Sequence, residues 1–447
     1  MNSYVEKVIG NVKRKYANEP EFIQAVEEVL ISIEPLVDAH PEYERYDLLN
    51  RVVEPERQFT FRVVWQDDNG AYHTNTGYRF QFNGAIGPYK GGLRFQKNVY
   101  PGIIKFLGFE QIFKNSLTGL PIGGAKGGSD FDPQGKSDSE IMRFCQSFMQ
   151  GLYRFIGPDV DVPAGDMGVG GREIGYLFGE YRRLKGAFEN GVLTGKGLSY
   201  GGSLIRPEAT GYGAVYYLLN VLGHFGDKFE GKTIVASGYG NVTWGVCKKA
   251  AQLGAKVVTI SGRDGYVYDE DGVTTDEKID YLLEMRASTK GSIKDYAEKF
   301  NVPFFPGEKP WGVKGDIVMP CATQNEVGIE EAKKIIANGT KYYIEVSNMS
   351  TEAEAQAYLR EHAVVAPSKA VNAGGVATSA LEMSQNSERL SWTSDEVDSR
   401  LKGIMDHVYK VSVEAAEKYG LGYDLVAGAN LAGFEKVAEA MVEQGVF

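Results

Sequence analysis

Residues 84–130 contain the residue types best suited to chemistry, three lysines in an unusual setting. Lys90 lies in GPYKGG and Lys126 in GGAKGG, while Lys114 follows an apolar helical run that begins at Ile103. Glycine has no Cβ atom, so the backbone beside Lys90 and Lys126 can approach a ligand closely. The pKa of a lysine falls when its side chain is buried or lies near other cations. Three lysines in one cleft would suit a small dianion, with one cation for each of two carboxylates and a third lysine for chemistry.

The alternative is that these lysines are solvated surface residues between turns. Two Lys-Gly-Gly patterns on either side of one helix favour the binding site over that alternative. Asp166 follows later, in the sequence PAGD and ahead of a glycine-rich helix start. It is either a turn or N-cap residue, or a carboxylate on a rigid loop beside the cationic cleft, where it could carry a proton.

Composition excludes several other classes of function. The chain has 447 residues, which predicts two or three domains, and 43% of them are hydrophobic. Its net charge of −11 argues against a nucleic-acid or membrane-surface role. Three scattered cysteines and five scattered histidines argue against a disulfide framework and against a metal site. No apolar run has the length of a signal peptide or of a membrane span, so we expect a cytoplasmic protein.

The first half of the chain alternates helical and strand patterns. Apolar spacing predicts a helix over 21–37 that stops near His40, and a second amphipathic helix over 138–156. Residues 57–65 and 77–82 are typical of strands, and Asp67-Asp68-Asn69-Gly70 predicts a hairpin turn between them. The glycine-rich residues 195–213 are expected to form a hinge that leads into a helix.

A different pattern begins at residue 231. A strand over 233–237, a glycine-rich turn over 238–243, a helix over 246–253 and a strand over 256–261 are predicted. This βαβ context makes the Gly238-x-Gly240 sequence good evidence for a dinucleotide site. Gly238 would form the tight turn, and Gly240 would let a pyrophosphate reach the helix N-terminus. Thr243 stands at the third position of the fingerprint, so we expect the strand and the helix to lie slightly further apart.

The remaining chain predicts an α/β, mostly parallel, doubly wound sheet. Strands over 316–319, 342–346 and 364–366 alternate with helical stretches. Thr323, Asn348 and Asn372 follow strand ends, where such sheets bind ligands. A glycine-rich loop from residue 368 enters a long helix with Ser379 in its second turn, either as a ligand or as a helix-interior serine bonded to its own backbone. Amphipathic helices over 394–418 and 430–443 close the chain.

Six motifs in one order resemble the hexameric, small-subunit glutamate dehydrogenases of the Glu/Leu/Phe/Val dehydrogenase superfamily. They are GPYKGGLRF, KFLGFEQIFKNSLTGLPIGGAKGGSDFDP, DVPAGDMGVGGREIGY, GGSLIRPEATGYG, MPCATQNE and NAGGVATSALEMSQN. The resemblance runs from about residue 20 to the C-terminus. It implies an N-terminal α/β substrate and oligomerisation domain over 1–202 and a Rossmann-type dinucleotide-binding domain over 203–424, with a cleft between them. A C-terminal helix over 425–447 is expected to pack back on the first domain.

The resemblance implies reversible oxidative deamination of L-glutamate to 2-oxoglutarate and ammonium, in a cytoplasmic homohexamer. The resemblance also assigns roles to individual residues of this chain. The implied residues are Lys126 as the catalytic lysine, Asp166 as the proton carrier, Lys90 and Ser379 for the γ-carboxylate, Lys114 and Gln111 for the α-carboxylate, and the carbonyls of Gly165 and Asn372 for the ammonium group.

The cofactor is expected to be NAD, with NADP as the alternative. Gly262 and Tyr239 resemble the pattern of NAD-specific members, whereas Arg263 and Arg286 keep NADP open. The resemblance places Thr210 and Asn241 on the dinucleotide. The other residues expected to bind it are Gly238, Gly240, Val242, Arg263, Asp264 and Asn348.

Two competing hypotheses remain. A relative that acts on leucine, valine or phenylalanine would not need a cation at position 90, so Lys90 argues against it. A non-enzymatic dinucleotide-binding regulator would not need Lys126 and Asp166 together. The departures from the family pattern are Thr243, Ser347 with Asn348, and Val99-Tyr100-Pro101, and none of them falls on the implied catalytic set.

Overall fold

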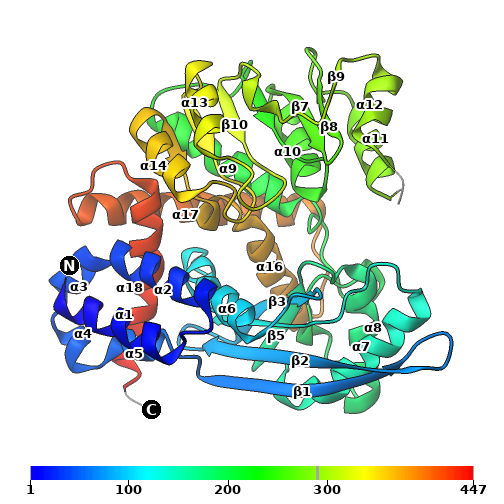
Figure 1. Cartoon of the computed structure of the whole chain (residues 1–447), viewed down its shortest axis with the longest axis vertical. Coiled ribbons are helices and arrows are strands. Elements are labelled where there is room, and N and C mark those ends of the chain that lie inside the picture. Colours follow the sequence, from blue (N-terminus) through cyan, green and yellow to red (C-terminus); the bar gives the residue numbers. More distant parts are fainter. Residues whose placement is uncertain (1, 288–290, 446–447) are drawn as a thin grey trace.

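The computed structural model describes residues 2–287 and 291–445, and it has two halves, each built on its own sheet (Figure 1). Residues 446–447 of the predicted C-terminal helix lie outside the described residues, as does Met1. The sheet of the N-terminal half has the strand order β1-β2-β4-β3-β5. Its strands are β1 Arg57–Gln66, β2 Tyr72–Asn83, β3 Tyr89–Phe95, β4 Gly124–Ser129 and β5 Asp161–Gly165. Its helices are α1 Ser3–Lys15, α2 Pro20–Ser32, α3 Glu34–Ala39, α4 Glu42–Arg45, α5 Leu48–Val52, α6 Pro101–Leu117, α7 Asp138–Leu152 and α8 Gly171–Lys185.

The core of this half consists mainly of two apolar clusters, one that includes α6 and one that includes α7. Helix α6 packs against β2 and β4 and also against α2, and its buried phenylalanines join a cluster with the N-terminal helices. Helix α7 packs against β1 and α8, in a second cluster. Trp65 is buried in this second cluster, and Phe80 is buried in a smaller one with Tyr78, Val99 and Ile104.

Strands β3 and β4 are unusually rich in glycine, and the sequence patterns therefore did not predict them as strands. They run parallel and are connected through α6, so β3, α6 and β4 form one βαβ unit. A Cβ atom at Gly91 would lie 1.6 Å from the carbonyl oxygen of Ala125, so only glycine lets the two strands approach this closely. The alternative that placed Lys90 and Lys126 in solvent between turns is wrong, because both lie on buried strands.

The second half is built on a sheet with the order β12-β11-β10-β6-β7-β8-β9. Strands from β12 to β7 are parallel, while β8 and β9 are antiparallel additions at one edge. The strands are β6 Thr233–Ala236, β7 Lys256–Gly262, β8 Gly265–Tyr268, β9 Phe304–Pro306, β10 Ile317–Met319, β11 Tyr342–Ile344 and β12 Val364–Ala366. The helices are α9 Ala209–His224, α10 Asn241–Gln252, α11 Asp276–Ala287, α12 Ile293–Phe300, α13 Ile329–Ala337, α14 Ala353–His362, α15 Ser368–Val371, α16 Gly374–Glu388, α17 Ser394–Lys418 and α18 Leu425–Glu443. The predicted doubly wound sheet is confirmed.

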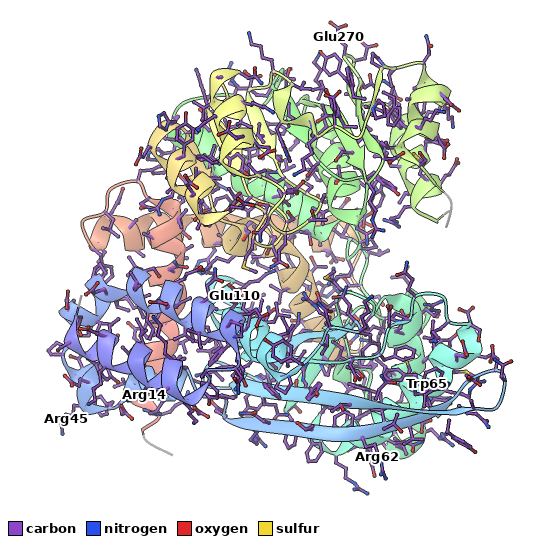
Figure 2. The ribbon with its side chains drawn as sticks, in the orientation of Figure 1. Arg14, Arg45, Arg62, Trp65, Glu110 and Glu270 are labelled. Carbon is purple, nitrogen blue, oxygen red and sulfur yellow. The ribbon has the colours of Figure 1, made fainter. Side chains whose placement is uncertain are left out.

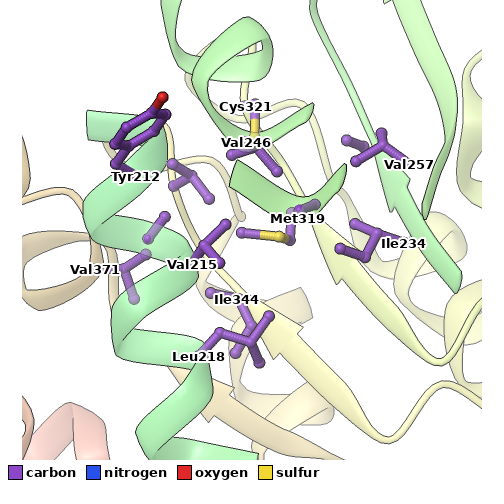
Figure 3. Close-up of a cluster of buried hydrophobic side chains, with 14 of the residues drawn as sticks. Tyr212, Val215, Leu218, Ile234, Val246, Val257, Met319, Cys321, Ile344 and Val371 are labelled. Carbon is purple, nitrogen blue, oxygen red and sulfur yellow. The ribbon is translucent and has the colours of Figure 1, made fainter. Parts of the chain in front are cut away.

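The apolar side chains of α9 and of the central strands share one buried cluster. Figure 3 shows Val215 and Leu218 of α9 directed at Met319 of β10 and Ile344 of β11. The strand order reverses at β6, which has β7 on one side and β10 on the other. The carboxyl end of β6 is therefore the switch point at which sheets of this kind bind ligands.

Two helices connect the halves. Helix α16 packs against α9 and α17 of the second half and also against residues 190–192 of the first (Figure 1). Helix α18 follows α17 and packs against α6 and α2. Both helices come from the C-terminal part of the sequence and contact the first half. The domain boundaries at 202 and 424 stay a prediction.

Several element boundaries differ from the sequence predictions. The helix expected over 21–37 is interrupted at Ile33, because Pro35 lacks the N–H that a continuous helix needs. Helix α10 begins at Asn241 rather than at 246, and α18 begins at Leu425 rather than at 430, after the N-cap Asp424. Strand β2 starts at Tyr72 instead of 77, and α1 was not predicted. No helix among the described residues is long and apolar enough to cross a membrane.

Candidate active site

The βαβ unit of β3, α6 and β4 places all three lysines around one region. Lys90 and Arg94 share one face of β3, because side chains two and four residues apart in a strand point the same way. Lys126 lies on β4 beneath α6, where Gly108 of the helix approaches its Cβ atom. Lys114 lies in the last turn of α6, and Asp166 follows β5.

Lys126 and Asp166 are in direct contact. The Lys126 Nζ atom lies 3.0 Å from Asp166 Oδ2, and the Arg94 Nε atom donates to the same oxygen at 2.9 Å. Lys126 is 6% exposed, so this ion pair is largely shielded from water. One carboxylate oxygen thus faces a lysine and an arginine in a site of low polarity, which strengthens the interaction between the charges.

This arrangement alters the pKa of each group. Burial lowers the pKa of Lys126, Asp166 opposes that effect, and Arg94 adds to it. Burial and the Lys126 ammonium lower the pKa of Lys114 to about 8. Burial alone would raise the pKa of Asp166, but Lys126 and Arg94 outweigh it and lower the pKa to about 2. At neutral pH Asp166 is therefore an ionised carboxylate, and it lies beside a lysine whose pKa is lowered by burial.

Lys90 lies apart from this ion pair and is more deeply buried. It is 1% exposed, and its Nζ atom donates to the Val162 carbonyl at 3.0 Å and to Thr194 Oγ1 at 2.8 Å. Burial, together with the nearby Arg79 and Arg206, holds the pKa of Lys90 well below its ordinary value. An anion that reached Lys90 would supply the negative charge that such a group requires.

Ser379 enters the same region from the second half. It lies in the second turn of α16, as predicted, and is 2% exposed. Its Oγ atom donates to the Gly375 carbonyl at 3.1 Å and accepts from Arg206 Nε at 3.0 Å. Ser379 therefore bonds its own helix, as one alternative predicted, and also contacts the partly buried Arg206, while its role as a ligand residue stays a prediction. Arg206 is a further cation beside Lys90.

The other predicted substrate residues are Gln111, Gly165 and Asn372. Gln111 Nε2 donates to Asn115 Oδ1 at 2.6 Å, one turn along α6. Gly165 ends β5 beside Asp166. Asn372 follows α15, and its Nδ2 atom donates to Asn348 Oδ1 at 2.7 Å. The Asn372 Oδ1 atom is buried without a hydrogen-bond partner among the described residues, so it is available to a ligand donor.

The predicted dinucleotide turn lies at the switch point of the second sheet. Gly238 has φ of +80°, which a side chain would disfavour, and its N–H donates to Ser261 Oγ at 2.9 Å. Gly240 is exposed, and no atom lies within 4 Å of the position that its Cβ would take. Helix α10 begins immediately afterwards with Asn241 and Val242, whose N–H groups have no partner within the helix. This turn fits a phosphate group at a helix N-terminus.

Thr243, the unusual third residue of the fingerprint, is accommodated by a hydrogen bond. It is 0% exposed, and its Oγ1 atom donates to the Ser237 carbonyl at 2.8 Å. The hydroxyl therefore joins α10 to the end of β6.

Asp264 and Arg263 follow β7 and are both exposed. The carboxylate of Asp264 accepts a hydrogen bond from the hydroxyl of Ser292, the N-cap of α12. An ordered, accessible carboxylate in this place fits a ribose hydroxyl. Thr210 lies at the start of α9, where Gly375 of α16 packs against it.

Three residues that the sequence did not single out belong to the site. Arg94 binds Asp166, Thr194 accepts from Lys90, and Arg206 binds Ser379. Arg94 and Arg206 stand inside the motifs GPYKGGLRF and GGSLIRPEATGYG, so the motifs themselves were a usable signal. Among the described residues, no group of three or more His, Cys, Asp and Glu side chains is placed to hold a metal ion.

Curated proteins similar to this chain span its whole length. An NAD-specific glutamate dehydrogenase from Clostridium symbiosum is 66% identical, with 100% of each chain covered. An NAD-specific glutamate dehydrogenase from Bacteroides fragilis is 56% identical, with 99% of each chain covered. An NADP-specific glutamate dehydrogenase from Psychrobacter is 53% identical, again with 99% of each covered.

Solved structures similar to this chain are also glutamate dehydrogenases. A glutamate dehydrogenase with 66% identity matches with a TM-score of 0.98 over 100% of both chains. A hetero-hexameric glutamate dehydrogenase from Thermus thermophilus in a leucine-bound form matches with a TM-score of 0.80 at 28% identity, over 92% of this chain and 97% of that one.

Two family models cover most of the chain. The Glu/Leu/Phe/Val dehydrogenase dimerisation domain matches residues 55–183, and the Glutamate/Leucine/Phenylalanine/Valine dehydrogenase model matches residues 201–445. The first match contains the three lysines and Asp166, and the second contains the dinucleotide turn and Ser379. The chain belongs to the Glu/Leu/Phe/Val dehydrogenase family.

Proposed function

We propose that this chain is a glutamate dehydrogenase, which interconverts L-glutamate with 2-oxoglutarate and ammonium and prefers NAD to NADP. The observation that carries the proposal is the second group of cations, in which Lys90 is 1% exposed and lies near Arg206, which donates to Ser379. A family member that acts on an apolar amino acid would bring no negative charge to Lys90, which is buried beside the cations Arg79 and Arg206, and this is costly. Glutamate supplies that charge with its γ-carboxylate.

The substrate spans the two cationic regions in this proposal. Lys90 and Ser379 bind the γ-carboxylate, while Lys114 and Gln111 bind the α-carboxylate. The carbonyls of Gly165 and Asn372 accept from the ammonium group, which orients Cα. A charged group held at each end of a short substrate fixes the reacting atom, and such orientation provides much of the catalytic effect.

Lys126 and Asp166 transfer the protons of the deamination reaction in this proposal. Loss of hydride from Cα converts the amino acid to an imine. The lowered pKa of Lys126 favours its neutral amine, which can take a proton from the water that attacks the imine carbon. Asp166, in contact with Lys126 at 3.0 Å, relays a proton to the departing nitrogen. A bound nicotinamide dinucleotide supplies the acceptor for the hydride that leaves Cα. The protein contributes orientation, charge and proton transfer.

The dinucleotide is held along the carboxyl edge of the second sheet in this proposal. The turn from Gly238 to Val242, with Asn241 at the helix start, binds the pyrophosphate. Thr210 and Asn348 contact the nicotinamide end, and Arg263 with Asp264 contacts the adenosine ribose. The exposed Asp264 carboxylate would accept from a ribose 2′-hydroxyl and would repel a 2′-phosphate, which supports NAD. Two relatives with NAD-specific names support the same preference.

We further propose a cytoplasmic homohexamer with domains over residues 1–202 and 203–424. The hetero-hexameric relative from Thermus thermophilus supports the number of subunits. Strand β1 lies at the edge of its sheet, so its outer backbone groups are available to another subunit. Light scattering should give six chains per particle at micromolar concentration, and a stable monomer would contradict this assembly.

The test of the proposed function is to remove the γ-carboxylate site. The double change Lys90→Leu and Ser379→Val should lower kcat/KM for glutamate by several orders of magnitude, since sites of paired polar groups discriminate by about 10⁴–10⁵. It should raise kcat/KM for norleucine and methionine, whose apolar tails fit the emptied pocket, while the chemistry at Cα is unchanged.

A matched control is Lys105→Leu, which removes another buried lysine. Lys105 is 3% exposed and pairs with Glu19 at 2.7 Å, away from the site. It should leave the ratio of kcat/KM for glutamate over norleucine unaltered. If the double variant keeps this ratio within tenfold of wild type, Lys90 and Ser379 do not bind the γ-carboxylate.

A further inference from the structure

A buried ion pair joins α16 to the segment that precedes the second half. Lys196 Nζ and Glu382 Oε1 are 2.7 Å apart, and neither side chain is exposed to water. The Glu382 carboxylate also accepts from the N–H groups of Gly195 at 3.0 Å and Lys196 at 3.3 Å. One turn further along α16, Asn386 Oδ1 accepts from Lys196 Nζ at 2.9 Å. A single carboxylate thus fixes two consecutive backbone groups and one buried cation.

The two ends of this connection lie beside the γ-carboxylate pocket. Thr194, next to Gly195, accepts from Lys90 Nζ at 2.8 Å. Ser379 lies three residues before Glu382 on α16, so the two side chains share one face of the helix. Ser379 in turn accepts from Arg206 Nε at 3.0 Å. Glu382 therefore sets the spacing between the part of the pocket that belongs to β3 and the part that belongs to α16.

Glu382 also affects the cations of the proposed γ-carboxylate site through its charge. Glu382 acts on three cations, the buried Lys90 and Lys196 and the partly buried Arg206, and Asp161 is a second carboxylate that acts on Lys90. Burial lowers the pKa of Lys196 and of Lys90, and Glu382 opposes the loss of the proton in both. The carboxylate thus helps to keep the pocket cationic when no substrate anion is bound.

We propose that Glu382 is a positioning residue for substrate specificity, which holds Ser379 and Arg206 at the distance from Lys90 that a γ-carboxylate requires. This inference rests on the proposed function, because it assumes that Lys90 and Ser379 bind that carboxylate. Glu382 does not touch the substrate and acts through the segment 194–196 and through α16.

The variant Glu382→Gln tests the proposal. All three partners of the carboxylate are donors, and an amide offers one oxygen in place of two, so one donor must lose its acceptor. We expect kcat/KM for glutamate to fall at least tenfold, mainly through a higher KM, while kcat/KM for norleucine changes less than threefold. A merely structural role would lower both values together.

The same change in a Lys90→Leu background separates the mechanism from a general loss of fit. There the γ-carboxylate site is already absent, so Glu382→Gln should alter the ratio of glutamate over norleucine less than threefold. A tenfold fall of the ratio in that background would overturn the proposal, and so would equal losses for both substrates in the single variant.

Two further variants complete the experiment. Asp398→Asn breaks the Lys249–Asp398 pair of 2.9 Å in the second half, and it should lower stability without changing the substrate ratio. If Glu382→Gln does not fold, Glu382→Asp retains the charge but is one methylene shorter, and it should lower the ratio at least threefold. An unchanged ratio with Glu382→Asp would then refute the proposal. A wild-type enzyme inactive on glutamate would instead refute the proposed function itself.

Discussion

The contact between Lys126 and Asp166 is the chemical centre of the proposed mechanism, and it gives the first prediction. Lys126→Ala removes a group needed in the transition state, so kcat should fall by about 10²–10⁴-fold or more. The dinucleotide turn lies in the other half of the chain, so the affinity for NADH, measured by fluorescence titration, should be retained.

Asp166→Asn should behave similarly, because the amide keeps the shape of the carboxylate but cannot carry the proton. If Lys126→Ala retains more than about a hundredth of the wild-type rate, the lysine positions the substrate without transferring a proton.

Arg94 provides a second prediction, on pH dependence. Its guanidinium donates to Asp166 at 2.9 Å and contributes to the lowered pKa of Lys126. In the proposed mechanism, deamination requires the neutral amine of Lys126, so its rate should rise with pH through the pKa of that group. Arg94→Met removes a nearby positive charge and therefore raises this pKa, and the rising limb of kcat/KM for glutamate should move to higher pH.

A suitable control is Arg14→Met, a change on the distant N-terminal helix α1 (Figure 2), which should leave the limb in place. A limb that stays fixed or moves to lower pH in Arg94→Met would mean that Lys126 does not govern it.

At this scale, the sequence predicted the residues that carry unusual chemistry but not the residues that support them. Lys90 and Lys126 stood out because lysine between glycines is uncommon. Arg94 is 72 residues from Asp166, and Arg206 is 173 residues from Ser379. Pairs this far apart meet through the sheet topology, which no local pattern contains.

The glycine-rich strands give a prediction at the scale of elements. A Cβ at Gly91 would lie 1.6 Å from the Ala125 carbonyl, so Gly91→Ala must push β3 and β4 apart. Overpacking of this kind costs about 1–3 kcal/mol. We expect a lower Tm and a lower kcat/KM, since the same strands carry Lys90 and Lys126.

Gly10→Ala is the control variant, because it makes the same substitution where a Cβ atom meets no neighbouring atom. Gly10 lies within α1, and nothing lies within 4 Å of the position of its Cβ. Alanine there should stabilise the fold by about 0.5–1 kcal/mol and leave activity unaltered. Equal Tm values for the Gly91→Ala variant and wild type would show that β3 and β4 tolerate a side chain.

The turn after β7 provides the prediction on cofactor choice. Asp264 is exposed and is fixed by the hydroxyl of Ser292. We expect kcat/KM to be higher for NAD than for NADP, and Asp264→Asn should reduce that preference by removing the charge that repels a 2′-phosphate. Higher kcat/KM for NADP in the wild type would contradict it.

Elements with regular patterns were predicted well, and those shaped by tertiary contacts were not. The helix over 394–418 and the strand over 364–366 have the predicted bounds. Strands β3 and β4 lack the apolar residues typical of strands, because glycine there makes room for close packing. The first turn of α10 was missed because Asn241 and Thr243 have low helix propensity, which the buried contacts of the helix override.

At the scale of the whole molecule, the site depends on both halves. Figure 2 shows Glu110 on the side of α6 that faces the second half, one turn before Lys114. Burial raises the pKa of Glu110, and Lys369 of α15 opposes that effect, so charges from the two halves act on each other. The doubly wound sheet was predictable from alternating strands and helices. The return of α18 to the first half came from the family resemblance, and the packing of α16 against the first half was not predicted.

The most direct test of the central claim is the initial rate of NADH formation with single amino acids. Purified enzyme and NAD would be mixed separately with L-glutamate, L-leucine, L-valine and L-phenylalanine, and kcat/KM determined for each. The account predicts that kcat/KM for glutamate exceeds the others by at least about 10⁴, the discrimination expected of a buried charged pocket. A higher kcat/KM for any of the apolar amino acids, or no NADH formation with glutamate, would contradict it.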